Sequence, residues 1–214
     1  MADRLSIYSM ACLMAGERAL ASLSENREPR YLLDQVWNDR GVDKCLEEGQ
    51  WRFAFRTVQI DYDPGVTPTF GYAYAFDKPV DYVITTAVCQ EDHFRVPLLQ
   101  YSDEGPFWYA DIQTIYVKYV SNDANYGGNL GKWPPAFEEF VAAHFASRIV
   151  LKLSNDEKKT ELVMKLRENL LKKAKSKSAM ADPTSFEAQG AWSRSRMRWR
   201  NRSDGGNTTG SLIG

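Results

Sequence analysis

The spacing of the apolar residues changes twice along the chain, and this change limits the folds that it can adopt. In residues 1–50 and 134–181, apolar side chains recur every three or four residues, which is typical of amphipathic helices. Between residues 51 and 120 they alternate with polar or small residues, which is typical of β-strands. We therefore predict an α+β protein: an antiparallel helical bundle with an inserted antiparallel β-domain and an extended C-terminal arm.

These patterns divide the chain into three parts. Residues 1–50 and 134–181 form the predicted helical bundle, and residues 51–133 form the inserted β-domain with a glycine-rich loop at its end. Residues 182–214 have few aliphatic side chains and several glycines and serines, so they have too little apolar area to offset their ordering entropy. We predict that this last part, called the arm below, becomes ordered only on a partner.

The first part predicts two helices. The apolar stripe of the first helix consists of Leu5, Tyr8, Cys12 and Ala15. Gly16 ends this helix, and the pair Glu28-Pro29 opens the second, because proline is tolerated in a first helical turn. We expect Gly41 to weaken or bend the second helix and Gly49 to end it.

The middle part predicts antiparallel strands. The clearest alternation lies in Trp51–Ile60, Tyr72–Phe76 and Ile115–Tyr119, and weaker candidates are Tyr82–Val88 and Phe94–Leu99. Proline and glycine clusters separate these segments at 63–65, 78–79 and 105–106. Because the connections are too short for helical crossovers, we expect antiparallel hairpins.

The last folded part predicts two further helices. Pro134-Pro135 opens one that runs to about Leu153. Ser154 and Glu157 have the spacing of a capping box, which predicts that the next helix begins there. Its predicted apolar stripe is Leu162, Val163, Leu166 and Leu170, and its end carries Lys172, Lys173, Lys175 and Lys177.

Nothing in the composition requires a disulfide bond or a membrane. A chain of 214 residues buries enough surface to fold without disulfides, and Cys12, Cys45 and Cys89 lie in apolar patterns without a CxxC pair. We expect three buried, reduced thiols. The longest apolar runs are too short to span a bilayer and the N-terminus lacks a signal-peptide pattern, so we expect a protein made in the cytoplasm with no membrane partner.

Residues for catalysis are scarce. The two histidines, His93 and His144, are interpreted as a solvated turn residue and a packed core residue. The acid pairs Asp61/Asp63 and Asp103/Glu104 are interpreted as solvated turn carboxylates rather than metal ligands. No HExxH, GxSxG, GxxxxGK[ST] or GxGxxG motif is present. We therefore predict no catalytic, metal or cofactor site, and a protein that is not an enzyme.

The charge of the chain is unevenly distributed. Residues 1–150 carry 13 Lys and Arg against 21 Asp and Glu, whereas residues 151–214 carry 14 against 7. In the arm, arginines occupy every second position from Arg194 to Arg202, so an extended chain places all five on one side. Three interpretations stay open: a tail that neutralises nucleic-acid phosphates, a solvated inert tail, or a segment that docks in a partner groove through arginine and tryptophan.

The order of several short motifs resembles a known family. These are CLEEGQWRFA at residues 45–54, KPVDY at 78–82, a Tyr-Val strand at 116–120, and WPPAFEEFVAA at 133–143. In this order they resemble the head-to-tail adaptor proteins of tailed phages, the tail tubular protein A family of short-tailed phages and its relatives. The resemblance covers roughly residues 5–200, and this sequence departs from the shorter members in carrying Met197–Gly214, including the 205–214 tail.

The resemblance implies a structural virion protein of the phage neck. Its relatives form a dodecamer ring, a connector that continues the DNA channel between the portal protein and the tail nozzle protein, and that acts in DNA ejection. Genome DNA would pass through without sequence-specific binding. In relatives the C-terminal segment docks on the portal. The positions that this implies as the portal-binding arm are Trp192, Ser193, Arg194, Ser195, Arg196, Met197, Arg198, Trp199 and Arg200.

A second class of function remains open from the residues alone. A nucleic-acid-binding accessory protein would use the same arginines on phosphates, and its affinity would fall steeply with salt. An acidic body that repels DNA, with the positive charge confined to an arm, favours the adaptor interpretation.

Overall fold

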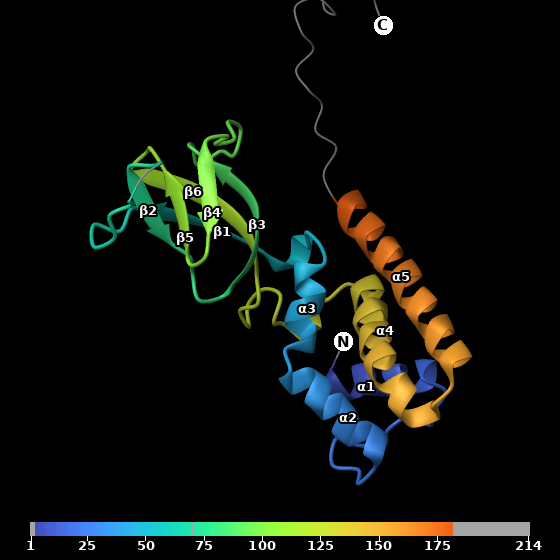
Figure 1. Ribbon diagram of the computed structural model, residues 1–214. Coiled ribbons are helices and arrows are strands. Elements are labelled where there is room, and N and C mark those ends of the chain that lie inside the picture. Colours follow the sequence, from blue (N-terminus) through green and yellow to red (C-terminus); the bar gives the residue numbers. More distant parts are fainter. Residues whose placement is uncertain (1–2, 70, 182–214) are drawn as a thin grey trace, which may run out of the picture. The chain divides into compact units, whose positions relative to one another are not determined.

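The computed structural model describes residues 3–69 and 71–181. These residues form α-helices and two small antiparallel sheets (Figure 1), which confirms the α+β class. The α-helices are α1 (Arg4–Met14), α2 (Glu28–Asn38), α3 (Gly41–Glu47), α4 (Pro135–Ser154) and α5 (Glu157–Met180). The strands are β1 (Phe55–Asp61), β2 (Tyr74–Asp77), β3 (Tyr82–Cys89), β4 (Tyr101–Glu104), β5 (Phe107–Ala110) and β6 (Thr114–Ser121). Two short 3₁₀ turns are η1 (Arg52–Ala54) and η2 (Leu130–Lys132).

Helix α4 is the centre of the helical layer, the name used here for α1–α5. It contacts α1, α2, α3 and α5. Alanines at 142, 143 and 146 are fully buried and let the neighbouring helices approach closely. Large side chains fill the remaining space. The largest fully buried ones in this core are Trp51, Tyr8, Phe137, Phe140, Phe145, Ile7, Leu33 and Leu46.

The strands form a small β-sandwich of two three-stranded sheets. One sheet has the order β1-β6-β3 and the other has the order β2-β5-β4, with every pair antiparallel. Their facing side chains make a second, smaller core, which consists of Phe76, Val88, Leu98, Trp108, Ala110, Ile115, Val117 and Tyr119. Only β4 and β5 form a tight hairpin, with Gly105 at positive φ in its turn. The other pairings join strands that are distant in sequence, so the expected run of hairpins is wrong.

One predicted strand and one predicted strand boundary are also wrong. Residues 94–99 make only one isolated bridge, between Cys89 and Pro97, and Phe94 has a φ of 53°, which a strand does not allow. Trp51 precedes a 3₁₀ turn, so β1 begins at Phe55 rather than at Trp51. The hairpin strand Tyr101–Glu104 was not predicted, because it lacks apolar alternation.

The predicted capping box is wrong as well. Asp156, not Ser154, caps α5, and its carboxylate accepts hydrogen bonds from the backbone N–H groups of Lys158 and Lys159. The Ser154 hydroxyl instead donates to the Val150 carbonyl within α4. The predicted stripe of α5 is also rotated: Val163 is buried, but Leu162 is 67 % exposed. The region before residue 50 has three helices rather than the predicted two, because the helix breaks between Asn38 and Gly41, next to the predicted weak point.

The junction between the helical layer and the β-sandwich contains the first motif of the resemblance. The Trp51 indole N–H donates to the Cys45 carbonyl at 3.0 Å, and its ring lies 4.7 Å from that of Phe137. Gly127 packs against Ala54 from the other side, and any Cβ there would collide with the Ser121 carbonyl oxygen. The residue types of this motif are therefore explained by packing.

The described residues through Ala181 form a single unit. Cys12, Cys45 and Cys89 are all buried free thiols, as predicted. Burial raises the pKa of the Cys45 thiol far above its ordinary value, so this thiol stays protonated and behaves as a small apolar side chain.

Candidate functional site

The nine predicted portal-binding residues, 192–200, lie outside the described residues. The structure does describe the end of α5, after which the arm begins. The Ser178 hydroxyl in its last turn donates to the Gln50 carbonyl and accepts from the Arg52 backbone N–H, each at 3.3 Å. These two bonds fix the end of α5 beside the start of the β-sandwich, and so fix the point from which the arm departs.

The end of α5 is strongly basic. Lys172, Lys173, Lys175 and Lys177 are exposed there. Only Lys173 of these forms an ion pair within the described residues, with Glu139 of α4 at 2.9 Å. The basic composition of the arm is thus already present in the last turns of α5, which precede it in the sequence.

The second motif of the resemblance, KPVDY, contains a carboxylate that is satisfied inside the protein. Asp81 accepts hydrogen bonds from Arg56 at 2.9 Å, from Tyr119 at 3.1 Å and from the Ser121 hydroxyl. Burial alone would raise the pKa of Asp81, but these donors outweigh it and lower the pKa below its ordinary value. The aspartate, immediately before β3, links that strand to β1 and β6. Its carboxylate is occupied by these internal donors and is not available to a ligand.

The lysine and tyrosine of the same motif belong to a second network. Lys78 pairs with Asp103, and Asp103 also accepts from Thr85 at 2.7 Å and from the Trp108 indole at 3.2 Å. Burial would raise the pKa of Asp103, but the bonds from Lys78 and Thr85 lower it. Asp103 is exposed, as predicted, but it lies in β4 rather than in a turn and accepts bonds from the side chains of Lys78, Thr85 and Trp108.

His144 is a packed histidine of α4, as predicted, and is 3 % exposed. Burial, together with the charges of Arg167, Arg148 and Lys44, lowers its pKa to about 4. Its Nδ1 accepts from Arg167 at 3.1 Å, which leaves the proton of the neutral ring on Nε2. Nε2 has no hydrogen-bond partner within the described residues.

A polar pocket of about 280 Å³ lies next to this histidine. It is lined by His144, Ser147, Arg148, Met164, Arg167 and Glu168. Arg167 is already paired with Glu48, and the Nε2 atom of His144 is buried beneath the lining. These lining residues include no nucleophile–base pair, and we assign them a structural role.

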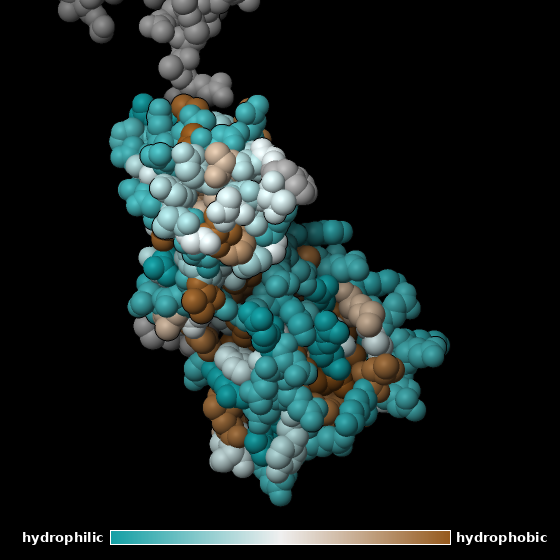
Figure 2. Space-filling model, turned by 60° about the vertical axis from the view of Figure 1, so that its left-hand side comes forward, coloured by the Kyte–Doolittle hydropathy of each residue, from teal (hydrophilic) through white to brown (hydrophobic). Residues whose placement is uncertain are grey.

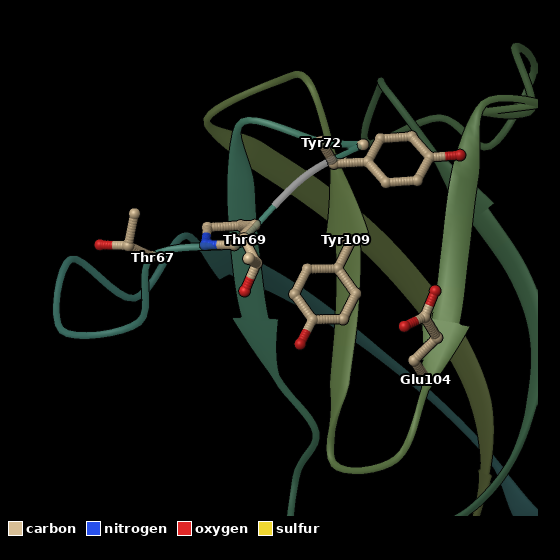
Figure 3. A pocket seen from close by; sticks show the side chains of 7 residues that line it. Thr67, Thr69, Tyr72, Glu104 and Tyr109 are labelled. Atoms are coloured by element: carbon tan, nitrogen blue, oxygen red, sulfur yellow. The ribbon is translucent and has the colours of Figure 1, made fainter.

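A second pocket, of about 360 Å³, lies on the outer face of the sheet β2-β5-β4. Its lining residues are Thr67, Pro68, Thr69, Gly71, Tyr72, Glu104 and Tyr109. Figure 3 shows the ring of Tyr109 standing out from the central strand, with Tyr72 from the β1–β2 loop and Glu104 from β4 beside it. Rings and a carboxylate on one surface suit binding rather than catalysis.

Several large apolar side chains remain exposed on the helical layer. They are Leu13 of α1, Leu151 of α4, and Leu162, Met164 and Met180 of α5. Figure 2 shows one face of the molecule, where hydrophobic residues are scattered over a largely hydrophilic surface. Exposed apolar side chains that are scattered in this way are normal on protein surfaces and do not by themselves mark an interface.

Neither a metal nor a membrane site emerges from the described part of the chain. Residues 3–69 and 71–181 contain no group of three or more His, Cys, Asp or Glu side chains that could hold a metal ion. No helix among them is long and apolar enough to cross a bilayer. Comparison of the chain with protein-family models and with curated proteins gives no match.

Two features of these sites were missed at the sequence level. The Asp103 network was missed because its donors come from the residue after β2, from β3 and from β5, which only the sheet pairing brings together. The outer-face pocket was missed because Tyr72 and Tyr109 lie 37 positions apart and only the fold brings them to one surface. The aromatic run at 107–109 was the one available signal.

Proposed function

We propose that this protein is a structural head-to-tail adaptor of a tailed phage. In this role it forms a ring, with twelve copies, between the portal protein and the tail nozzle protein, and the ring continues the DNA channel of the virion neck. The helical layer would form the ring, and the arm would dock on the portal.

The observation that carries this proposal is the structural position of two motifs of the resemblance, residues 45–54 and 78–82. Trp51 and Ala54 lie where the helical layer meets the β-sandwich, and Asp81 links three strands of that sandwich. A helical bundle with an inserted β-domain is the architecture that the resemblance implies. Residues chosen for packing at these junctions support a common architecture more strongly than scattered surface matches would.

The charge distribution and the exposed apolar side chains support the same proposal. Residues 1–150 have an excess of eight negative charges, which would repel DNA from a channel wall rather than hold it. Exposed Leu162 and Met164 on α5 would be covered by a neighbouring subunit in a ring. The arm, with its five alternating arginines, would supply the positive charge for an acidic portal surface.

The test is electron microscopy of the purified protein mixed with the portal protein encoded with it, at moderate salt. We expect stacked rings for the native chain. In one variant Arg194, Arg196, Arg198, Arg200 and Arg202 become glutamine, and in a matched control all five become lysine. The glutamine variant should leave bare portals, and the lysine control should retain part of the binding. Bare portals with the native chain would overturn the adaptor proposal.

A nucleic-acid-binding accessory protein is the second candidate. The observation that favours it is the run of exposed lysines at the end of α5, three of which lack an ion pair in the described part of the chain. Together with the arm, they would follow a phosphate backbone. This function predicts that log Kd for duplex DNA varies with log salt with a slope of about 4 or 5, if five arginines each release one counterion.

The two candidates are separated by one gel-shift series. DNA bound tightly at low salt and released with that slope, by a protein that leaves portals bare, would establish the accessory function. Weak DNA binding, combined with a portal complex that survives moderate salt, is the result that the adaptor proposal predicts.

A further inference from the structure

The sheet β2-β5-β4 carries two contrasting rows of side chains, which its register sets opposite each other. On the inner face, Phe76, Trp108 and Asp103 lie side by side on the three strands. One residue further on, the outer face places Asp77, Phe107 and Glu104 in the same alignment. Each row is thus a carboxylate and an aromatic ring in direct register, but only the outer row has carboxylates on both sides of the ring.

The carboxylate of the inner row has its hydrogen-bond and ion-pair partners within the protein. Asp103 receives an ion pair from Lys78, and hydrogen bonds from Thr85 and Trp108. The same lysine lies 4.8 Å from the ring centre of Tyr82 and 5.5 Å from that of Trp108. This chain therefore satisfies an acidic and aromatic cluster by placing a cation on it.

The outer row has no such cation among the described residues. Asp77 and Glu104 are exposed and form no ion pair there, and Glu104 accepts only from the Ser102 hydroxyl. Phe107 lies between them, with its ring 6.1 Å from that of Tyr109. Strands are spaced about 4.8 Å apart, so the two carboxylates start from backbone positions about 10 Å apart across the ring.

The pocket extends this row with a concave wall. Glu104 belongs to both the row and the pocket. Tyr109, two positions after Phe107 on β5, lines the pocket together with Tyr72 of the β1–β2 loop, as Figure 3 shows. Two threonine side chains, Thr67 and Thr69, complete the polar lining. A space of about 360 Å³ is enough for one long side chain.

We propose that this outer face is a docking site for an arginine side chain of a partner protein. A guanidinium can stack on Phe107 or Tyr109 and donate in its own plane to carboxylates on either side. Residues 51–133 carry 6 Lys and Arg against 10 Asp and Glu, so the surrounding charge also favours a basic partner. A metal ion is a poorer fit, because the two carboxylates have an aromatic ring between them. The inference concerns the sheet alone and does not depend on the adaptor function.

The test is an NMR titration of the full chain with N-acetyl-arginine amide. N-acetyl-citrulline amide, which has the same shape without the charge, is the control ligand. We expect saturable shifts of the ring resonances of Phe107 and Tyr109 with the arginine compound only. The double variant Asp77→Asn/Glu104→Gln should weaken binding about tenfold, from the loss of two ion pairs beside a ring.

A matched variant guards against a general charge effect. Glu91→Gln/Asp92→Asn removes two charges from an exposed turn of the same domain and should leave the titration unchanged. The spectra also report directly whether each variant is folded. Equal binding of the arginine and citrulline compounds would overturn the proposal. So would equal weakening by the two double variants, or shifts spread over the surface without saturation at Phe107 and Tyr109.

Discussion

The helical layer and the β-sandwich are stabilised by different kinds of interaction. The helical layer surrounds α4 with a large core, in which Trp51, Phe137 and Phe140 contact one another. The sandwich core is much smaller, and each of its two main polar networks is centred on an aspartate, Asp81 or Asp103. A three-stranded sheet has little apolar area to bury, so directional bonds to charged acceptors contribute a larger share of its stability.

This difference predicts which kind of substitution should destabilise each region most. Removing apolar volume should harm the helical layer most, and removing a charge should harm the sandwich most. Acid should affect both, but in different ranges of pH, because the sensitive group is a histidine in one region and an aspartate in the other.

The largest effect is expected at Trp51. Trp51→Ala would leave a cavity at the junction, since the side chain is 1 % exposed and contacts Phe137 and Phe140. We expect the free energy of unfolding to fall by about 3–5 kcal/mol, measured by urea denaturation. Trp51→Phe, which keeps a ring but loses the bond to the Cys45 carbonyl, should cost less. Equal losses for the two variants would mean that the hydrogen bond, not the volume, dominates.

The next effect is the pH dependence that His144 gives the helical layer. Its pKa is about 4 in the folded protein, against an ordinary value of 6.5, so the unfolded chain takes up the proton first as the pH falls. Stability is retained above about pH 6.5 and should fall by about 3 kcal/mol between there and pH 4. Urea titrations across this range measure it. His144→Gln should flatten the curve, and an unchanged slope in that variant would assign the effect elsewhere.

A smaller loss is expected when Asp81 loses its charge. Asp81→Asn places an amide among the donors of Arg56, Tyr119 and Ser121, and should cost about 2 kcal/mol. Because the folded-state pKa is lowered, the native chain should keep this contribution above its ordinary pKa of 3.8 and lose it below. Asp77→Asn, on the exposed face, is the matched control and should change stability by less than about 0.5 kcal/mol. Similar losses for both would contradict the internal role of Asp81.

The smallest effect distinguishes the two candidate caps of α5. Asp156→Ala should cost about 1 kcal/mol, because its carboxylate accepts from two backbone N–H groups of the first turn. Ser154→Ala should change little, since its hydroxyl bonds within α4. Thermal unfolding of the two variants measures both, and the reverse order of effects would restore the capping box predicted from the spacing.

Local chemistry explains which sequence predictions succeeded. The start of α4 at Pro135 was located correctly and the weak point near Gly41 approximately, because these residues act on the backbone of their own segment. His144 was correctly placed in the core, because its neighbours on one helical face are aromatic and aliphatic. The Leu162 stripe failed because regular spacing defines a face without deciding which face meets α4.

The candidate sites depended on the tertiary structure to a greater degree. The arm was found from its composition alone, and its predicted role remains a proposal, since residues 192–200 lie beyond the described residues. The row of Asp77, Phe107 and Glu104 could not be predicted, because it exists only through the pairing of β5 with both β2 and β4.

By itself, the sequence determined the α+β class, the position of the main helices and the separation of an acidic body from a basic arm, because period and charge are properties of local segments. The tertiary structure alone decided which strands pair and which carboxylates are neutralised. Those outcomes depend on contacts between residues far apart in the chain, such as Arg56 with Asp81 and Lys78 with Asp103, and no local pattern encodes a partner across that distance.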